Sequence, residues 1–372
     1  MIKLPTTNGL IDFETSLKSA PKAEGEFNRI VFSAAHVVCN PFDNNEIDWE
    51  TTLNYRRYLW NLGFGVAEAM DTAQRGMGLT WEQSLELIKL SVKESDGNLI
   101  YSGVGTDHLE LKKYTLDEIV SAYLYQMDQV QQAGGKVILM ASRALALSAQ
   151  SPEDYLYVYR EVLNHADSPV ILHWLGEMFD PALVGYWGKE DHYEAMDVCL
   201  EVIKENKRHI KGIKLSLLSK EKEIKFRRML PEEVLMFTGD DFNYPELIAG
   251  DEQGFSHALL GIFDAIAPVA SYALKQFAEG NTDEYFKYMN PTLPLSRHIF
   301  QAPTRFYKTG VVFMAYLNGL QDHFAMIDGQ QSARTVYHLS ELYQLASKAD
   351  TFLNPETAEE RMKKYLALYG VE

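Results

Sequence analysis

Short apolar runs alternate with longer helical patterns along the chain from Arg29 onward. Most of these runs do not alternate apolar and polar residues, which is typical of strands buried on both faces of a parallel sheet. Repeated strand-helix units favour two architectures, an open doubly wound sheet or a closed (β/α)8 barrel. The predicted strands cover residues 30–38, 64–70, 99–104, 136–142, 169–175, 210–217, 233–238 and 254–260.

Three helix starts set the length of the repeating unit. Thr80 and Thr115 each begin the capping-box pattern, in which a Gln or Glu follows three residues later. Ser151 begins a related pattern with Pro152 in the first turn and Asp154 in the place of Glu or Gln. The starts lie about 35 residues apart, the length expected of one strand-helix unit.

Eight such strands favour the closed (β/α)8 TIM barrel. No G-x-G-x-x-G follows the first strand, so the main sequence support for a dinucleotide-binding sheet is missing. We expect an N-terminal extension over residues 1–28, the barrel over 29–268, and a C-terminal helical part packed on the barrel over 269–372. The better helical patterns of that last part cover 269–279, 282–289, 300–317 and 333–349.

Composition restricts the partners and the cellular location that we expect for this protein. The formal net charge of −17 repels phosphate backbones, so no nucleic-acid partner is expected. No apolar run reaches the roughly 18 residues of a membrane span, and the first residues lack the apolar segment of a signal peptide. Two cysteines, Cys39 and Cys199, are too few for a disulfide framework. These features predict a cytoplasmic protein without membrane association.

In a (β/α)8 barrel the active site lies at the C-terminal ends of the strands. Candidate residues with polar or ionisable groups fall on or just after seven of the predicted strands. They are His36, Glu68, Asp71, Thr72, Thr106, Asp107, His108, Ser142, Arg143, His173, Trp174, Lys214, Ser216, Asp240 and Asp241.

Lys214 stands out among them by its position within the predicted sixth strand. Side chains alternate between the two faces of a strand, and the apolar face here carries Ile213, Leu215 and Leu217. Lys214 therefore shares the inward face with Gly212. A desolvated lysine is costly unless its pKa falls or it is paired, and a lowered pKa is what a Schiff-base lysine needs. An ion pair with a neighbouring carboxylate is the alternative.

The histidines allow a different interpretation. His36, His108 and His173 fall near three strand ends with carboxylates close by in sequence, a set that can bind zinc or another divalent metal. No H-x-H or H-E-x-x-H is present, however, and isolated histidines are more often hydrogen-bonded structural groups. We therefore predict no metal and no other cofactor, and retain a metal-dependent hydrolase or isomerase as the alternative function.

Four short motifs together resemble one known family. They are N-P-F-D at residues 40–43, G-V-G-T at 103–106, G-I-K at 212–214 and T-G-D-D at 238–241. Their order and spacing are similar to T-P-F-D, the third-strand segment, G-x-K and S-G-D-D of the dihydrodipicolinate synthase and N-acetylneuraminate lyase family. The resemblance covers roughly residues 29–345 and identifies the chain as a divergent branch of that family.

The resemblance implies a class I aldolase or lyase on a (β/α)8 barrel, assembled as a homodimer or homotetramer. It implies that Lys214 forms the Schiff base and that Asp241 binds substrate hydroxyls.

The chain departs from the family's sequence pattern in two informative places. The family's G-T-T-G-E, which receives a substrate carboxylate, is replaced by M-D-T-A-Q at residues 70–74, so Asp71 takes the place of the first threonine and only Thr72 remains. The proton-relaying tyrosine of the fourth strand is missing, and Ser142 or Arg143 lies at about its position.

The sequence thus predicts a Schiff-base-forming carbon-carbon lyase in carbohydrate metabolism. Lys214 is the expected nucleophile, and His173 or His36 takes the proton role because imidazole titrates near neutral pH. Asp71 would repel a substrate carboxylate and accept hydrogen bonds from hydroxyls, unless it pairs with Arg75 or Arg143. A neutral keto-sugar is therefore expected rather than pyruvate.

The predicted catalytic residues are Lys214, His173 and Arg143, and the predicted substrate-binding residues are Asp71, Thr72, His36, His108, Asp240 and Asp241. A third possibility is a non-catalytic barrel that binds a sugar-like ligand.

Overall fold

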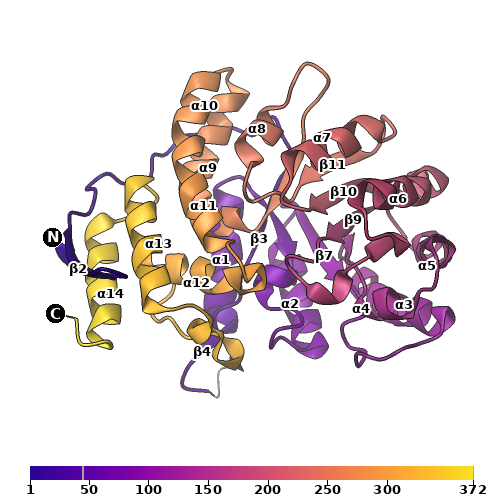
Figure 1. Cartoon of the computed structure of the whole chain (residues 1–372), viewed down its shortest axis with the longest axis horizontal. Coiled ribbons are helices and arrows are strands. Elements are labelled where there is room, and N and C mark those ends of the chain that lie inside the picture. Colours follow the sequence, from indigo (N-terminus) through magenta and orange to yellow (C-terminus); the bar gives the residue numbers. More distant parts are fainter. Residues whose placement is uncertain (44–45, 372) are drawn as a thin grey trace. The chain divides into compact units, whose positions relative to one another are not determined.

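The computed structural model describes residues 1–43 and 46–371. Within them, eight strands close into a barrel, which confirms the predicted (β/α)8 architecture (Figure 1). Each strand falls inside or close to its predicted range. In the order around the barrel they are β3 (Val31–Ala34), β6 (Gly65–Glu68), β7 (Ile100–Val104), β8 (Val137–Leu139), β9 (Val170–Leu175), β10 (Ile210–Ser216), β11 (Leu235–Thr238) and β12 (His257–Leu260).

Residue contacts group the chain into two compact units, residues 65–260 and residues 1–64 with 261–372. The first unit contains strands β6 to β12, and every neighbouring pair from β6 to β12 is parallel. A helix follows each strand from β6 to β11. These helices are α2 (Trp81–Glu94), α3 (Leu116–Gln132), α4 (Arg143–Ser148), α5 (Pro152–Asn164), α6 (His192–Asn206), α7 (Lys220–Met229) and α8 (Tyr244–Ala249), with short 3-10 helices η1 (Asp71–Ala73), η2 (Pro181–Leu183), η3 (Tyr186–Gly188) and η4 (Lys207–His209).

The predicted helix starts are confirmed. Thr80 and Thr115 both cap their helices through a reciprocal capping box, with Gln83 and Glu118 as partners. The third start differs chemically but serves the same purpose, since the Asp154 carboxylate accepts a hydrogen bond from the backbone N–H of Ser151. The sequence predicts these helix starts because a capping box is formed by residues only three positions apart in the chain.

The second unit contains β3, the first helix and the C-terminal helices. Its elements are the hairpin β1 (Ile2–Thr6) and β2 (Gly9–Phe13), the pair β4 (Cys39–Asn40) and β5 (Glu46–Ile47), and helices α1 (Trp49–Asn61), α9 (Ile262–Ala278), α10 (Thr282–Met289), α11 (Leu293–Ile299), α12 (Tyr307–Leu317), α13 (Val336–Lys348) and α14 (Pro355–Ala367), with 3-10 helices η5 (Asn290–Thr292), η6 (Thr304–Phe306) and η7 (Ile327–Ala333).

Three details of this unit differ from the sequence prediction. The N-terminal residues form an antiparallel hairpin whose strand β1 packs on α13 (Figure 1). The helix expected over 300–317 begins only at Tyr307, because Pro303 lacks the backbone N–H that a helix interior needs. Helices α11 and α14 lie inside the predicted helical part but outside its better patterns. None of the helices in the described part of the chain is long and apolar enough to span a membrane.

Candidate active site

Lys214 lies on the inner face of β10. It is the register partner of His173 on β9 and of Phe237 on β11, so these three side chains share one face of the parallel sheet. The opposite face carries Trp174, whose ring packs 6.1 Å from that of Phe226 on the outer helix α7. Lys214 and His173 therefore face the barrel interior, as the alternation along the sequence predicted for Lys214.

The Lys214 ammonium lies in a strongly desolvated setting with carboxylates nearby. Lys214 is 8% exposed. Burial lowers the pKa of Lys214, while the negative charges of Asp241 and, more weakly, Asp71 oppose that change. The net direction is downward, so the amine is easier to deprotonate than an ordinary lysine. A neutral amine is the form that attacks a carbonyl carbon.

His173 is the buried neighbour of Lys214. Its Nε2 lies 3.2 Å from the Oγ of Ser216, the next inward residue on β10. Burial and, secondarily, the positive charge of Lys214 keep the pKa of His173 well below its ordinary value. At neutral pH its imidazole is therefore uncharged and has one nitrogen able to accept a proton. Contrary to the prediction from the sequence, His173 does not titrate near neutral pH, because burial disfavours its charged form.

Asp71 begins the short helix η1 directly after β6, and Arg143 begins α4 directly after β8. The Arg143 guanidinium forms an ion pair with Asp180 in the loop after β9. Although burial disfavours its charged form, Asp180 and then Asp71 raise the pKa of Arg143. The strongest partner of Arg143 is thus Asp180, and Asp71 contributes to its field at longer range.

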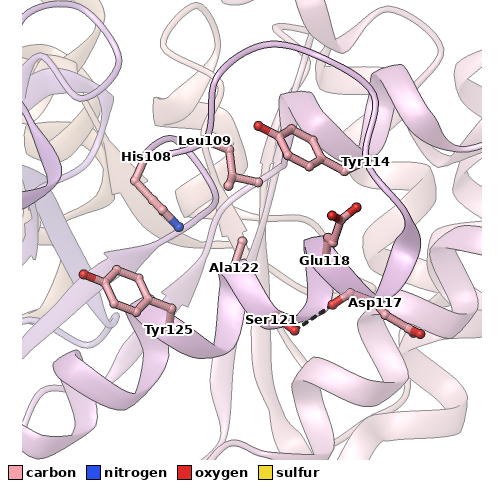
Figure 2. A pocket seen from close by; sticks show the side chains of 8 residues that line it. All are labelled: His108, Leu109, Tyr114, Asp117, Glu118, Ser121, Ala122 and Tyr125. Atoms are coloured by element: carbon pink, nitrogen blue, oxygen red, sulfur yellow. Dashed lines mark hydrogen bonds between the residues drawn. The ribbon is translucent and has the colours of Figure 1, made fainter.

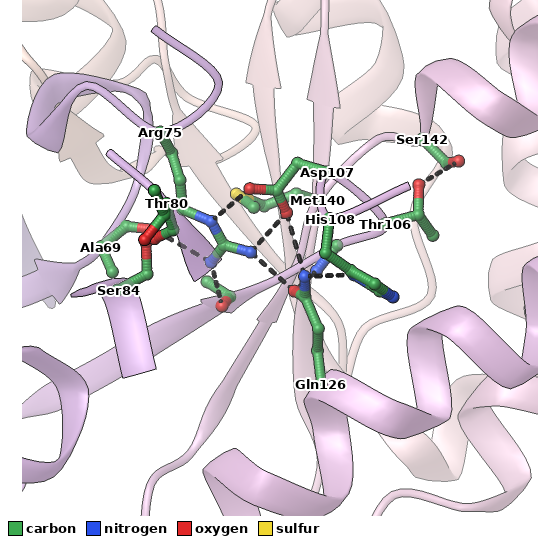
Figure 3. A network of polar contacts seen from close by, with 12 residues as sticks. Ala69, Arg75, Thr80, Ser84, Thr106, Asp107, His108, Gln126, Met140 and Ser142 are labelled. Carbon is green, nitrogen blue, oxygen red and sulfur yellow. Dashed lines mark hydrogen bonds and ion pairs between the residues drawn. The ribbon is translucent and has the colours of Figure 1, made fainter. Parts of the chain in front are cut away.

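Arg75 does not pair with Asp71, which was one of the alternatives left open by the sequence. Its Nε and Nη2 donate to the two carboxylate oxygens of Asp107 at 3.0 and 2.6 Å, and Nη2 also donates to Gln126 on α3 (Figure 3). Burial alone would raise the pKa of Asp107, but Arg75 and Gln126 hold it at about 2. The charge of Arg75 is therefore balanced by Asp107.

His108 lies against the outer helix α3 and is exposed. Its Nδ1 lies 2.8 Å from Nε2 of Gln126, and its ring lies 5.1 Å from that of Tyr125. The two rings line a surface pocket of about 460 Å³ (Figure 2), whose other lining residues are Leu109, Tyr114, Asp117, Glu118, Ser121 and Ala122. The structure thus does not bring His108 to the inner face that carries Lys214.

The two aspartates after β11 have different surroundings. The Asp240 carboxylate accepts hydrogen bonds from the backbone N–H of Phe242 and from Nδ2 of Asn243, so it stabilises the turn that follows β11. Asp241 is buried and is the main carboxylate acting on Lys214. Thr72 is buried within η1 beside Asp71. Of the predicted binding residues, Asp71 and Asp241 are those whose charges act on the lysine.

His36 belongs to a separate network inside the unit that contains β3. Its Nδ1 lies 2.8 Å from the Asp264 carboxylate and its Nε2 lies 3.0 Å from Oε1 of Gln321. Tyr55 donates a further hydrogen bond to Asp264. Both ring nitrogens of this fully buried histidine are thus engaged within the protein, which is the arrangement of a structural residue.

The structure does not bring the strand-end histidines together, because His36 pairs with Asp264 and His108 lies against α3. Among residues 1–43 and 46–371, no three His, Cys, Asp or Glu side chains are placed to bind one metal ion together. Two residues that contact the predicted site residues were not predicted. Gln126 could have been recognised as a polar residue on the buried face of α3, where an unpaired amide is costly. Asp180 lies in a loop, and only its ion pair with Arg143 in the structure identifies it.

Comparisons with known proteins agree on the fold. A family model described as "Protein of unknown function (DUF993)" matches residues 2–371. No curated protein sequence matches the chain. Among solved structures, a putative dihydrodipicolinate synthetase from Pseudomonas aeruginosa is similar, with a TM-score of 0.65, 14% identity, and coverage of 85% of this chain and 99% of that one.

Two further structures repeat this result. YagE, a prophage protein of the dihydrodipicolinic acid synthase family from E. coli K12 solved with pyruvate, has a TM-score of 0.66 and 14% identity over 87% of this chain and 99% of its own. The 4-hydroxy-tetrahydrodipicolinate synthase of Methylacidiphilum fumariolicum has a TM-score of 0.64 and 16% identity over 92% and 98%. At these identities the likeness establishes the barrel fold, as the sequence motifs predicted.

Proposed function

We propose that this chain, which belongs to the DUF993 family, is a Schiff-base-forming lyase or aldolase with Lys214 as its nucleophile. One observation carries the proposal. Lys214 is a buried lysine on the inner face of a barrel strand, where burial lowers the pKa of its amine and the charges of Asp241 and Asp71 act on it. The fold, similar to that of dihydrodipicolinate synthases, supports the same reaction type.

The reaction follows from these groups. The neutral Nζ of Lys214 attacks the substrate carbonyl carbon, and loss of water leaves an iminium cation next to Asp71 and Asp241. A base removes a proton from the substrate hydroxyl, the carbon-carbon bond breaks, and its electron pair moves into the iminium to form an enamine. Protonation of the enamine and hydrolysis by water release the second product and restore the amine. His173 is the proposed proton carrier because it is uncharged and adjacent to Lys214.

The charges around Lys214 favour a neutral substrate such as a keto-sugar. Asp71 and Asp241 both act on Lys214, while Arg75 is paired with Asp107 and Arg143 with Asp180. A substrate carboxylate ~4 Å from one of these carboxylates would be repelled by about 4 kcal/mol at an effective dielectric near 20, or nearly three decades in binding. Hydroxyl groups would instead donate to the carboxylates. A cytoplasmic location and a homodimer or homotetramer remain predictions.

Borohydride trapping tests the proposal. The protein is incubated with pyruvate or with neutral keto-sugars, reduced, and digested, and the adduct is located by mass spectrometry. We expect an adduct on Lys214 from the neutral compounds, and none in Lys214→Ala or Lys214→Arg, because guanidinium stays protonated. Full activity in Lys214→Ala would end the proposal. Efficient trapping of pyruvate, equal in wild type and Asp71→Thr, would contradict the substrate assignment alone.

A further inference from the structure

The loop that carries Asp71 begins with an unusual backbone conformation. Ala69, the residue after β6, has φ +49°, a left-handed value that residues with a β-carbon rarely adopt. Gln74, three residues after Asp71, is also left-handed with φ +62°. Ala69 is fully buried. Such conformations persist where the surrounding structure imposes them, and they are frequent at functional sites.

The Arg75 side chain ties the end of this loop back to its first residue, in addition to the backbone hydrogen bonds of η1. Its Nη1 donates to the carbonyl of Ala69 at 3.3 Å and to the carbonyl of Gly103 at 2.6 Å, so a single guanidinium joins the C-terminal ends of β6 and β7 (Figure 3). The approach is possible because position 103 is a glycine. A β-carbon there would lie 2.7 Å from the Ala69 oxygen and 3.2 Å from Arg75 Nη1.

Two further side chains hold the rest of the guanidinium. Asp107 accepts two of its hydrogen bonds, and Gln126 on α3 accepts a third. The Arg75 side chain is 1% exposed, and its Cζ lies 5.0 Å from the centroid of the Trp81 ring. Arg75 is therefore inaccessible to a substrate, and its positive charge is already balanced by Asp107.

We propose that Arg75 is a positioning residue for specificity, which closes the loop from Ala69 to Arg75 and thereby holds the Asp71 carboxylate in the field of Lys214. The preference for neutral over anionic carbonyl compounds then depends on a side chain that never touches the substrate. The inference rests on the proposed function for its substrate readout, but the placement of Asp71 can be measured without any turnover.

Two measurements test it on the full chain. The first is the ratio of borohydride trapping rates for dihydroxyacetone and pyruvate. The second is the pH dependence of Lys214 acylation by acetic anhydride, which reports the field of Asp71 at the amine whether or not the protein is an aldolase. The variants are Arg75→Lys, Asp71→Asn and their combination, with Arg160→Lys on the exposed surface of α5 as the control.

Lysine at position 75 cannot reach both carbonyls and Asp107 at once. We expect Arg75→Lys to lower the trapping ratio about tenfold and to shift the Lys214 titration downward, as Asp71→Asn does. The double variant should add nothing to Asp71→Asn, since the two residues act through one group. Effects that multiply in the double variant, or an Arg75→Lys protein with the wild-type ratio and titration, would overturn the inference.

Ala69→Gly covers the case in which Arg75→Lys does not fold. Glycine adopts the left-handed conformation without steric cost, so this variant should fold with a melting temperature at or above that of wild type. It should still show a lowered trapping ratio, because the loop is less constrained, and an unchanged ratio would count against the inference. If wild type forms no adduct on Lys214, the proposed function fails, while the acylation titration still decides whether Arg75 places Asp71.

Discussion

Gly239 packs so closely against Lys214 that a larger residue at position 239 would overlap the lysine side chain. A β-carbon built at position 239 would lie 2.9 Å from Cε of Lys214 and 2.2 Å from Oγ of Ser216. These are sub-van der Waals distances, so any larger residue forces the lysine or the serine to move. The glycine of the T-G-D-D motif is thus required by close packing against the candidate nucleophile, and the aspartates that follow it are carried to their places by the same turn.

Gly239→Ala should reduce borohydride trapping on Lys214 by about a hundredfold or more, because the added methyl group displaces the amine by a distance comparable to those that misalign catalytic groups. Circular dichroism should show that the barrel persists. Asp197→Ala on the exposed surface of α6 is a suitable control. Wild-type trapping in Gly239→Ala would mean that Lys214 is not held where the structure places it.

His173→Gln should separate imine formation from bond cleavage. Glutamine preserves a polar side chain near Ser216 but cannot carry a proton, and general acid-base groups contribute typically about 100- to 10,000-fold to a rate. We expect turnover of the best neutral substrate to fall within that range while the Lys214 adduct still forms under borohydride. Turnover at the wild-type rate would assign the proton transfer to another group.

Asp180→Asn should relax the discrimination against anionic substrates. Asparagine keeps the hydrogen bond that Oδ1 accepts from the backbone N–H of Ala182, but it removes the charge that pairs with Arg143. The released guanidinium would then attract a carboxylate, and pyruvate trapping should rise about tenfold relative to dihydroxyacetone. The exposed Asp197→Asn on α6 serves as the control, and equal ratios in the two variants would exclude this role for Arg143.

Glu223 on α7 should make the protein less stable at alkaline pH. Its carboxyl is fully buried and accepts a hydrogen bond from Ser256, and burial raises its pKa from 4.5 to about 8. Between these values the folded protein keeps a proton that the unfolded chain has lost. Stability therefore falls as pH rises from about 4.5 to about 8, by about 5 kcal/mol if nothing relaxes.

Glu223→Gln tests this linkage, because the amide resembles the protonated acid and does not ionise. Urea unfolding of the variant should depend less on pH than that of wild type, with the difference largest above pH 8. Glu221→Gln, an exposed neighbour on the same helix, should behave as wild type. Parallel pH profiles for Glu223→Gln and wild type would show that Glu223 has an ordinary pKa in the folded protein.

The fold was largely readable from the sequence because its signals are local. Apolar runs gave all eight barrel strands, and residues three apart in the chain gave the helix starts at Thr80 and Thr115. The alternation of side chains along one strand was enough to place Lys214 inward. The N-terminal hairpin was missed, and helices α11 and α14 lay outside the better helical patterns. The hairpin sequence has no strong period of its own, and its strand β1 finds its packing partner in α13, more than 300 residues later in the chain.

The sequence determined by itself that the chain is a barrel with an inward lysine on its sixth barrel strand; the tertiary structure decided which polar groups act with that lysine. Arg75 could have paired with Asp71, four residues away, but it binds Asp107 on the next strand's loop. His36 is paired with Asp264, 228 residues away, and His108 turns toward α3. The physical reason is that buried polar groups must be satisfied, and their partners come from wherever the fold brings strand ends and helices together, which no local pattern records.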